Sequence, residues 1–412
     1  MNEPVTLPSN VPILRAPPHL ELQPEGIELV VERIAASLAA TTVRRDRAGG
    51  HAAQERELIR QSGLLRLSIP RAQGGLQSDW ATIYRSIRRL AEVDSALAHV
   101  YAFHHLQMAS VLLYGNTEQQ QRLYAATVAD NLFWGNALNP LDRSLVATPV
   151  ADGWQLDGTK SYASGSVGSD WLCLSAHASA GDGQTALLIG VLPTRSPGVN
   201  VQQDWDGFGQ RQTDSGTVRF RGVILPRCDV LLAPDAPASI RSTLRPQLAQ
   251  LILTHLYLGI ARGALETARQ FIREQARPWF TSGLQRASDD PVLQHRFGQL
   301  RLLVRPAELA AEAAVARLQQ ALDAGQAVTA QQRGEVAVAA AEAKVLAHRA
   351  AIEISSQFFE LTGARSTKAS LGLDRFWRNA RVHTLHDPVD FKLQDIGRFA
   401  LDGTLPVPTP YS

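Results

Sequence analysis

Residues 373–392 read LDRFWRNARVHTLHDPVDFK, and they carry the most informative pattern in the chain. His383 and His386 are three positions apart, so both lie on one face if the segment is helical. Pro388 disfavours helical backbone at Asp387, which predicts that a helix ends near His386. A histidine at such an end can carry a proton near neutral pH. Two structural histidines bonded to backbone would give the same pattern.

Composition limits the classes of protein that this chain can be. Its 412 residues are 45% hydrophobic and 19% charged, which is enough to bury a large core in two or three domains. The formal charge of +2 gives no argument for nucleic acid or an anionic membrane surface as a partner. Cys173 and Cys228 support neither a disulfide framework nor a metal site, and no signal or membrane-spanning pattern is present. We therefore expect a cytoplasmic protein without a metal.

The first third of the chain predicts a helical domain behind a proline-rich arm. Residues 1–24 hold six prolines and read as an extended arm, and residues 25–131 follow a helical pattern. Thr117 and Gln120 are spaced as a capping box at a helix start. The segment 68–76, SIPRAQGGL, has the proline and paired glycines of a loop that turns tightly or lets backbone approach closely.

The remaining two thirds predict a sheet followed by a helical bundle. Within 132–235, short apolar runs alternate with Gly, Asp and Pro turns, which is typical of an antiparallel β domain, either a barrel or a sandwich. Residues 236–402 are rich in Ala and Leu and predict a four-helix bundle. A buried stripe is expected at a seven-residue spacing, at Val338, Val345, Ile352 and Phe359. Residues 403–412 form a proline-rich tail, which we expect to be a surface extension.

This order of domains, together with four motifs in the correct sequence, resembles the acyl-CoA dehydrogenase fold over residues 45–399. The motifs are LSIPRAQGGL from Leu67, DGWQLDGTKSYASGSVGSDWL from Asp152, GFGQRQTDSG from Gly207, and TGARST with DRFWRNARVHTLHDP from Thr362 onward. Dehydrogenases of this fold commonly close with a motif whose Glu abstracts the substrate α-proton. His386 stands where that Glu would fall, and a histidine suits an oxygenating flavin, which needs a proton donor and hydrogen-bond partner.

A closer resemblance is to the FMNH2-dependent monooxygenases of this fold, the dibenzothiophene monooxygenase group and its relatives in sulfur assimilation. It rests on RRDRAGG from Arg44, WGNA from Trp134, SYASGSVGSD from Ser161 and QARPW from Gln275, besides the closing motif. The resemblance implies FMN delivered as FMNH2 by a separate NAD(P)H:flavin reductase, O2 as co-substrate, and a C4a-hydroperoxide that oxygenates sulfur. Thiophenes or sulfides would give sulfoxides or sulfones, and sulfinates would give sulfonates. The resemblance also implies a homotetramer. The alternative interpretation of the sequence is an acyl-CoA dehydrogenase that uses FAD.

The resemblance also assigns roles to individual residues. His386 would lie by flavin C4a and N5, with Ser164 near N5 and Asn136 facing the isoalloxazine and the oxygen. By the same resemblance, Tyr162 and Trp205 would flank the cofactor, and His99 and Phe103 would line the substrate pocket. Arg277 and Arg365 are the candidates to pair with the cofactor phosphate, and a neighbouring subunit could contribute one of them.

Each of these residues also has a simpler reading. Ser164 could be a turn serine, His99 a core histidine and Trp205 a packing residue between domains. Arg277 could make a cation–π contact with the nearby Trp279. Phe103 departs from the dibenzothiophene monooxygenases, which have a tyrosine there, so the reaction type transfers better than the substrate. Tyr101 and Tyr162 are candidates to supply the missing hydroxyl.

Overall fold

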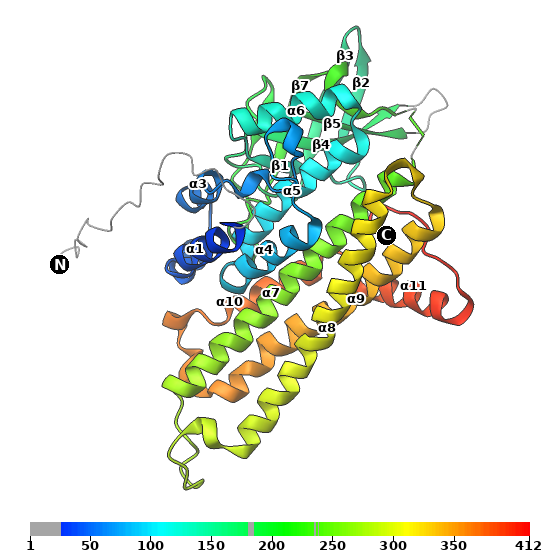
Figure 1. Cartoon of the computed structure of the whole chain (residues 1–412). Helices are drawn as coiled ribbons and strands as arrows, with labels where there is room; N and C mark the ends of the chain where they lie inside the picture. Colours follow the sequence, from blue (N-terminus) through cyan, green and yellow to red (C-terminus); the bar gives the residue numbers. More distant parts are fainter. Residues whose placement is uncertain (1–25, 180–184, 235, 238) are drawn as a thin grey trace, which may run out of the picture.

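The computed structural model describes residues 26–179, 185–234, 236–237 and 239–412. The arm predicted at 1–24 lies outside the described residues. The described chain forms a first group of helices, a sheet and a second group of helices, in that order (Figure 1). This is the order that the sequence predicts for the acyl-CoA dehydrogenase fold.

The first group of helices packs around helix α5 (Ser95–Tyr114), which is buried over almost its whole length. The carboxylate of Asp94 caps α5 by accepting a hydrogen bond from the Leu97 amide at 3.0 Å. Because α5 contacts both strand β1 and the long helix α7, apolar residues occur all around it. The other helices of this group are α1 (Ile27–Ala39), α2 (Thr42–Ala48), α3 (Ala53–Gln61), α4 (Trp80–Val93) and α6 (Thr117–Ala129).

The capping box of α6 lies one position before the predicted one. The Asn116 side chain accepts from the Gln119 amide at 2.9 Å, and the Gln119 side chain accepts from the Asn116 amide at 2.9 Å. The prediction of Thr117 with Gln120 is therefore wrong. Asparagine is at least as good an N-cap as threonine, and Gln119 provides the glutamine that a cap at Asn116 requires.

The loop at 68–76 turns tightly and also brings backbone segments together. Gly74 adopts a positive φ of 82°. A Cβ atom on Gly75 would lie 2.0 Å from the carbonyl oxygen of Ile69, so only glycine fits there.

The strands form one eight-stranded sheet with the order β6-β7-β3-β2-β4-β5-β8, and β1 pairs with β4. Consecutive pairs such as β2 with β3 and β4 with β5 are antiparallel, as predicted. β1 and β2, however, both pair with β4 in parallel, and no sequence pattern indicated this. The strands are β1 (Trp134–Ala137), β2 (Leu145–Val150), β3 (Gly153–Lys160), β4 (Trp171–Ser179), β5 (Thr185–Pro193), β6 (Val199–Val201), β7 (Val218–Pro226) and β8 (Val230–Leu232).

Three long helices, α7 (Arg245–Glu274), α8 (Pro291–Asp323) and α9 (Ala330–Thr362), form the body of the bundle. The shorter α10 (Arg375–Thr384) packs on α7 and α9, and α11 (Val389–Asp402) packs on α9. The segment Arg241–Glu274 is long and apolar enough to cross a membrane, but 89% of its most apolar window is buried inside the molecule. Its apolar residues therefore belong to the core.

The seven-residue stripe predicted on α9 holds for only half of its length. Val338 and Val345 are buried, whereas Ile352 and Phe359 are only partly buried. Ile354 and Phe358 are the buried residues in that part of the helix. An α-helix drifts by about 20° per heptad, so the buried face moves away from a strict seven-residue spacing.

One continuous core joins the N-terminal helices to the bundle, and a second fills the sheet. A third, smaller cluster lies between the sheet and helices α5 and α6. Helix α5 is therefore held between the sheet and the bundle, and its side chains reach both. The tail at 403–412 follows α11 and folds back on α9, because Arg333 donates to the carbonyls of Pro406 and Ser412.

Candidate active site

The predicted helix end near His386 is confirmed. Helix α10 ends at Thr384, and α11 begins at Val389 with Pro388 as its N-cap. His386 lies in the turn between them, where its amide donates to the His383 carbonyl at 3.0 Å. The turn gives the two histidines opposite environments, because His383 is buried while the His386 side chain is 40% exposed.

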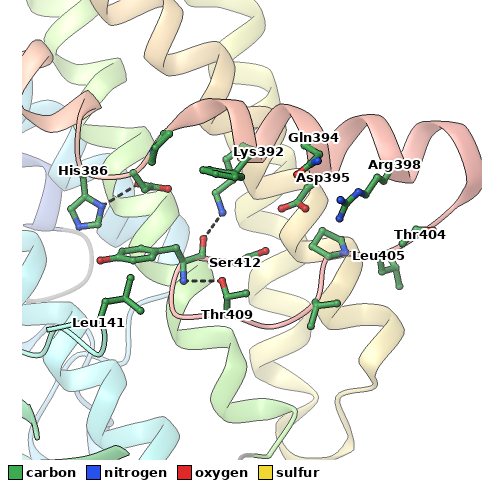
Figure 2. Close-up of a pocket in the computed structure, with 16 residues that line it drawn as sticks. Leu141, His386, Lys392, Gln394, Asp395, Arg398, Thr404, Leu405, Thr409 and Ser412 are labelled. Atoms are coloured by element: carbon green, nitrogen blue, oxygen red, sulfur yellow. Dashed lines mark hydrogen bonds and ion pairs between the residues drawn. The ribbon is translucent and has the colours of Figure 1, made fainter. Parts of the chain in front are cut away.

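His386 faces a pocket of about 580 Å³ between the α10–α11 turn, α11 and the tail (Figure 2). Leu141, from the loop between β1 and β2, forms part of its wall. The Tyr411 ring meets the His386 ring edge-on at 5.4 Å between centroids. Part of the tail that we expected to be a surface extension therefore lines this pocket.

Asp387 orients His386. His386 Nδ1 lies 3.1 Å from Asp387 Oδ1. Burial alone raises the pKa of Asp387, but the hydrogen bond from His386 and the charge of Lys344 together hold this pKa well below its usual range. An ionised carboxylate can only accept, so the proton of this bond belongs to Nδ1, and Nε2 is the nitrogen left for the pocket.

The second histidine pair, His99 and His383, forms a neutral cluster between α5 and α10. Their rings are 4.8 Å apart, and His99 stacks on Phe103 at 4.1 Å. Gln210 Nε2 lies 3.3 Å from His383 Nδ1. Burial lowers the pKa of His383 to about 3, and burial also puts the pKa of His99 well below its usual value of 6.5. Both rings are therefore uncharged at neutral pH.

The hydroxyl missing at Phe103 is not supplied by Tyr101. The Tyr101 hydroxyl lies 2.9 Å from Ser86 Oγ, and its side chain is fully buried in the core. Tyr162 is 68% exposed and meets Trp205 edge-on at 6.1 Å. Within the described residues, the Tyr162 hydroxyl makes no hydrogen bond. Of the two tyrosines, Tyr162 therefore remains the candidate to supply the hydroxyl that Phe103 lacks.

Buried neutral histidines give the fold a defined response to acid. His255 on α7 stacks on Tyr84 at 4.8 Å, and burial lowers its pKa to about 3. The unfolded chain binds this proton below about pH 6.5 and the folded chain does not, so stability falls as the pH decreases below 6.5. In the parent, the free energy of unfolding should fall between pH 7 and pH 5. We expect this fall to be about 2 kcal/mol smaller in His255→Phe, as measured by urea unfolding at the two pH values.

His295→Phe on the exposed face of α8 is the matched control for this variant. An equal acid loss in the parent and in His255→Phe would contradict a neutral, buried His255.

Asn136 and Ser164 lie side by side at the edge of the sheet. The Asn136 amide donates to the Ser164 carbonyl at 2.9 Å, and Asn136 Oδ1 accepts from Gln107 Nε2 at 3.1 Å. Ser164 Oγ is 2.7 Å from Ser215 Oγ, which is 2.7 Å from Thr213 Oγ1. The predicted pair is therefore brought together, inside a buried chain of hydroxyl groups.

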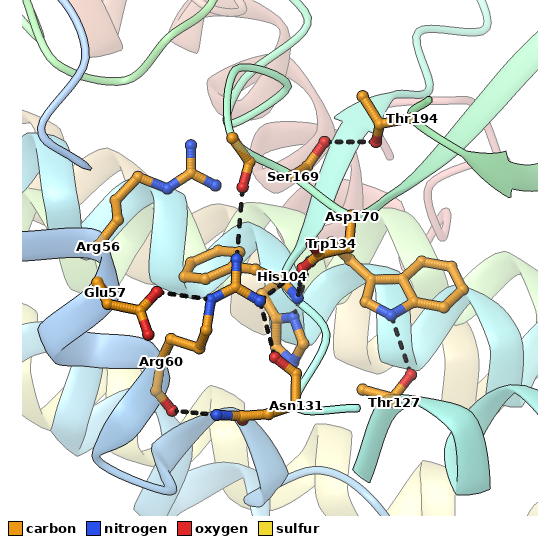
Figure 3. Close-up of polar contacts among 12 residues, drawn as sticks. Arg56, Glu57, Arg60, His104, Thr127, Asn131, Trp134, Ser169, Asp170 and Thr194 are labelled. Carbon is orange, nitrogen blue, oxygen red and sulfur yellow. Dashed lines mark hydrogen bonds and ion pairs between the residues drawn. The ribbon is translucent and has the colours of Figure 1, made fainter. Parts of the chain in front are cut away.

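A polar network fixes the strand that carries Asn136 (Figure 3). Asp170 accepts from Arg60 at 2.5 Å and from the Phe133 amide at 2.7 Å. Trp134 donates its ring N–H to Thr127 at 3.0 Å and its amide to His104 Nδ1 at 3.2 Å. Helices α3, α5 and α6 thus hold β1 in place, which sets the position of Asn136 against α5.

Trp205 joins this face to the histidine cluster. Its ring N–H donates to the Gln210 carbonyl at 2.8 Å, and the Gln210 side chain contacts His383. The contacts therefore run from Tyr162 through Trp205 and Gln210 to His383 and His99.

Arg277 and Arg365 are exposed and lie beyond the ends of α7 and α9. On α7, Gln250 contacts Asp387, and the helix runs on for 24 residues to Glu274. At 1.5 Å per residue this places the loop with Arg277 about 35 Å from Asp387. Figure 1 shows the α7–α8 loop at the end of the bundle far from the sheet. A phosphate role for these arginines remains a prediction.

The residues around Asn136 suit a flavin. An isoalloxazine ring has flat faces and a polar edge of carbonyl and N–H groups. Tyr162 and Trp205 provide aromatic surface, while Asn136 and Ser164 provide amide and hydroxyl groups. Among the described residues, several buried polar atoms near this face lack partners: Gln107 Oε1, Ser166 Oγ, Gln210 Oε1, His383 Nε2 and both His99 nitrogens. Such atoms fit a polar ligand that supplies the missing hydrogen bonds.

Comparison with known proteins gives the class. The acyl-CoA dehydrogenase N-terminal domain matches residues 23–130, and the acyl-CoA dehydrogenase C-terminal domain matches residues 251–391. The chain is 41% identical to a probable FMNH2-dependent monooxygenase, SfnC, of Pseudomonas putida, over 93% of this chain and 96% of the relative. It is also 41% identical to a dibenzothiophene monooxygenase of Rhodococcus qingshengii, over 92% of this chain and 94% of the relative.

Solved structures agree with these matches. The methanesulfinate monooxygenase MsuC of Pseudomonas fluorescens is 43% identical and superposes with a TM-score of 0.91, over 95% of this chain and all of that chain. The chain therefore belongs to the FMNH2-dependent monooxygenases of the acyl-CoA dehydrogenase fold. It is a flavin-dependent monooxygenase rather than an acyl-CoA dehydrogenase. Its cofactor is FMN.

Sequence reasoning missed several residues of this site: Lys344 and Gln250, which contact Asp387, Gln210, which contacts His383, and Tyr411. For Lys344 a signal existed, because it shares a helical face with Ala337, Ala340 and Ala351, and all three are buried. A charged residue on such a face needs a buried partner.

Proposed function

We propose that this enzyme oxygenates the sulfur atom of a small organosulfur compound, with reduced FMN delivered by a separate flavin reductase. One atom of O2 goes to sulfur and the other leaves as water. The observation that carries this proposal is His386, a partly exposed histidine held by an ionised Asp387. The sequence resemblance puts the carboxylate base of the dehydrogenases at this position. Relatives at about 40% identity are named for sulfur compounds, among them dibenzothiophene and methanesulfinate.

Reduced FMN, when bound, supplies the electrons that activate O2 for transfer of one oxygen atom. Tyr162 and Trp205 would flank the ring of the bound cofactor, and Asn136 and Ser164 would hydrogen-bond its polar edge. His386 keeps a proton on Nδ1 for Asp387 and exchanges a proton at Nε2, on the pocket side. His99 and Phe103 form the wall on the substrate side, and because His99 is neutral this wall carries no charge.

Exclusion of water is the second task of this site. His99, His383, Asn136 and Ser164 are all buried, and helix α5 has no exposed side along the residues that face them. A dry site favours transfer of oxygen to sulfur over release of hydrogen peroxide. The neutral wall achieves this without the cost of burying a charge.

The test is reconstitution with a flavin reductase, NADH and FMN under ¹⁸O2, with dibenzothiophene, a dialkyl sulfide and methanesulfinate as substrates. We expect one ¹⁸O atom per oxygenation in the product of at least one substrate. Tightly held FAD that is bleached by an acyl-CoA, with no ¹⁸O incorporated, would refute the proposal and support a dehydrogenase.

The phosphate of FMN needs a cation, and we propose that a homotetramer provides it. Arg277 and Arg365 are exposed at the ends of long helices, where a neighbouring copy can receive them. We expect Arg277→Ala to weaken binding of reduced FMN by about 10- to 100-fold, the loss expected for a charged hydrogen bond of 1.5–3 kcal/mol. Anaerobic fluorescence titration measures this affinity.

Arg286→Ala is the matched control, because Arg286 lies in the same connection and pairs with Asp289 at 3.0 Å. Light scattering reports whether the tetramer persists in each variant. Equal affinity of Arg277→Ala and Arg286→Ala for reduced FMN would refute the phosphate role. We also propose that the enzyme works in the cytoplasm, where its two free cysteines stay reduced.

A further inference from the structure

Lys344 is a buried cation in the middle of helix α9. Its side chain is 1% exposed. The ammonium group contacts Asp387 Oδ1 and donates to Gln250 Oε1 at 2.5 Å. Gln250 in turn donates through Nε2 to Asp387 Oδ2 at 3.4 Å. Helix α7, helix α9 and the turn before α11 therefore meet at one buried ion pair.

The same carboxylate oxygen that contacts Lys344 also binds His386. Asp387 Oδ1 is 3.1 Å from His386 Nδ1, so the contacts run from Lys344 through Asp387 to His386. Figure 2 shows this hydrogen bond as a dashed line from the His386 ring to the neighbouring carboxylate, and both residues line the pocket. The partly exposed end of this series is His386, and the buried end is the lysine.

Stability alone is a weak reason to retain such a pair. Desolvation of a buried pair offsets most of its attraction, and well-packed apolar residues often replace one at no cost. Burial lowers the pKa of Lys344 to about 8, although Asp387 opposes this shift. The ion pair nevertheless places one positive charge directly behind the carboxylate that holds His386.

We propose that Lys344 is a positioning residue for His386. Its charge balances that of the ionised Asp387, which accepts the Nδ1 hydrogen bond of His386 and leaves Nε2 toward the pocket. Gln250 holds both members of the pair and fixes their geometry. This inference rests on the proposed function for its catalytic meaning, but the contacts themselves do not depend on it.

Other charged and titratable groups surround the pair and must be considered. His348 lies one helical turn after Lys344 on α9, and Tyr257 lies on α7. Lys392 on α11 donates to the Tyr411 carbonyl, and His383 lies on α10. Lys392 is the other cation near Asp387, but its ammonium is engaged by the tail. Lys344 is thus the cation in direct contact with the carboxylate.

The first test uses the protein without FMN or substrate. Diethyl pyrocarbonate modifies accessible histidines in their neutral form, and mass spectrometry of the peptide that contains His386 measures its rate of modification against pH. In Lys344→Met, Asp387 keeps a negative charge with no compensating lysine, which favours protonated His386. We expect the midpoint of the modification profile to move upward by about one pH unit. An unmoved midpoint in folded Lys344→Met would overturn the proposal.

The second test is activity of the complete system. We expect Lys344→Met to lower product formed per reduced FMN by about 10- to 100-fold, the range for removing a group that supports a reacting histidine. Lys344→Arg keeps the charge and should recover part of this loss. Ser355→Ala, which removes a buried hydroxyl bonded within α9, is the control for disturbing that helix. Equal product yields in Lys344→Met and the parent would also overturn the proposal.

The Lys344→Met substitution leaves the charge of Asp387 buried without its lysine partner, so the variant protein can fail to fold. The double variant Lys344→Met/Asp387→Asn removes both charges together. We expect its His386 midpoint to fall about one pH unit below that of the parent, because the carboxylate is gone. A parental midpoint in the double variant would show that neither charge acts on His386. If the variants show these shifts but the parent oxygenates no sulfur compound, the positioning role of Lys344 stands and the proposed function is refuted.

Discussion

Replacement of His386 with alanine is expected to abolish coupled oxygenation and leave the fold near normal. A positioned acid–base group contributes about 10²- to 10⁴-fold to rate, and His386 is the group whose Nε2 faces the pocket. Folding should persist because the side chain is 40% exposed and Asp387 retains Lys344 and Gln250 as partners. The measurement is product and hydrogen peroxide formed per NADH consumed, with thermal unfolding followed in parallel.

Two further variants make this result specific. Leu385→Ala alters an exposed neighbour in the same turn and should keep parental coupling. His386→Asn keeps a donor toward Asp387 but cannot exchange a proton, so it should be as inactive as His386→Ala. Unchanged product yield and unchanged peroxide release in His386→Ala would remove His386 from the mechanism.

Gly209→Ala is expected to damage both the fold and the site. A Cβ on Gly209 would lie 2.2 Å from the Arg378 carbonyl oxygen and 2.8 Å from the Asn379 amide, both on α10. The next residue, Gln210, donates its amide to Asn379 Oδ1 at 2.7 Å and contacts His383. The substitution must push this loop away from α10, which costs about 1–3 kcal/mol of stability as overpacking.

The same substitution should also lower activity, by a free energy similar to its cost in stability. Displacement of the loop by about 1 Å moves Trp205 and Gln210 relative to His383, and such a shift can reduce the rate by about 100-fold. Urea unfolding and product yield per reduced FMN measure the two effects. Gly298→Ala on α8, where a Cβ meets nothing within 4 Å, is the control and should be neutral or stabilising by up to about 1 kcal/mol. Parental stability and yield in Gly209→Ala would contradict the close packing.

Local patterns were predictable where a residue and its neighbours in sequence decide the result. Pro388 predicted the helix end beside His386, and the alternating apolar runs predicted the strands. Predictions were wrong where neighbouring candidates compete, as with the cap of α6, or where a fixed spacing ignores helix geometry, as on α9. The parallel pairing of β1 and β2 with β4 depends on connections that no local pattern encodes.

The sequence by itself determined the order of helices, sheet and bundle, the family, and the helix end beside His386 and Asp387, because adjacent residues and ordered motifs encode these features. Only the tertiary structure decided which distant residues complete it. Lys344 lies 43 positions before Asp387, and Gln250 lies 137 positions before it. Gln210 is 173 positions from His383. Such contacts form when separate helices and loops pack face to face, and packing depends on the whole core rather than on any local pattern.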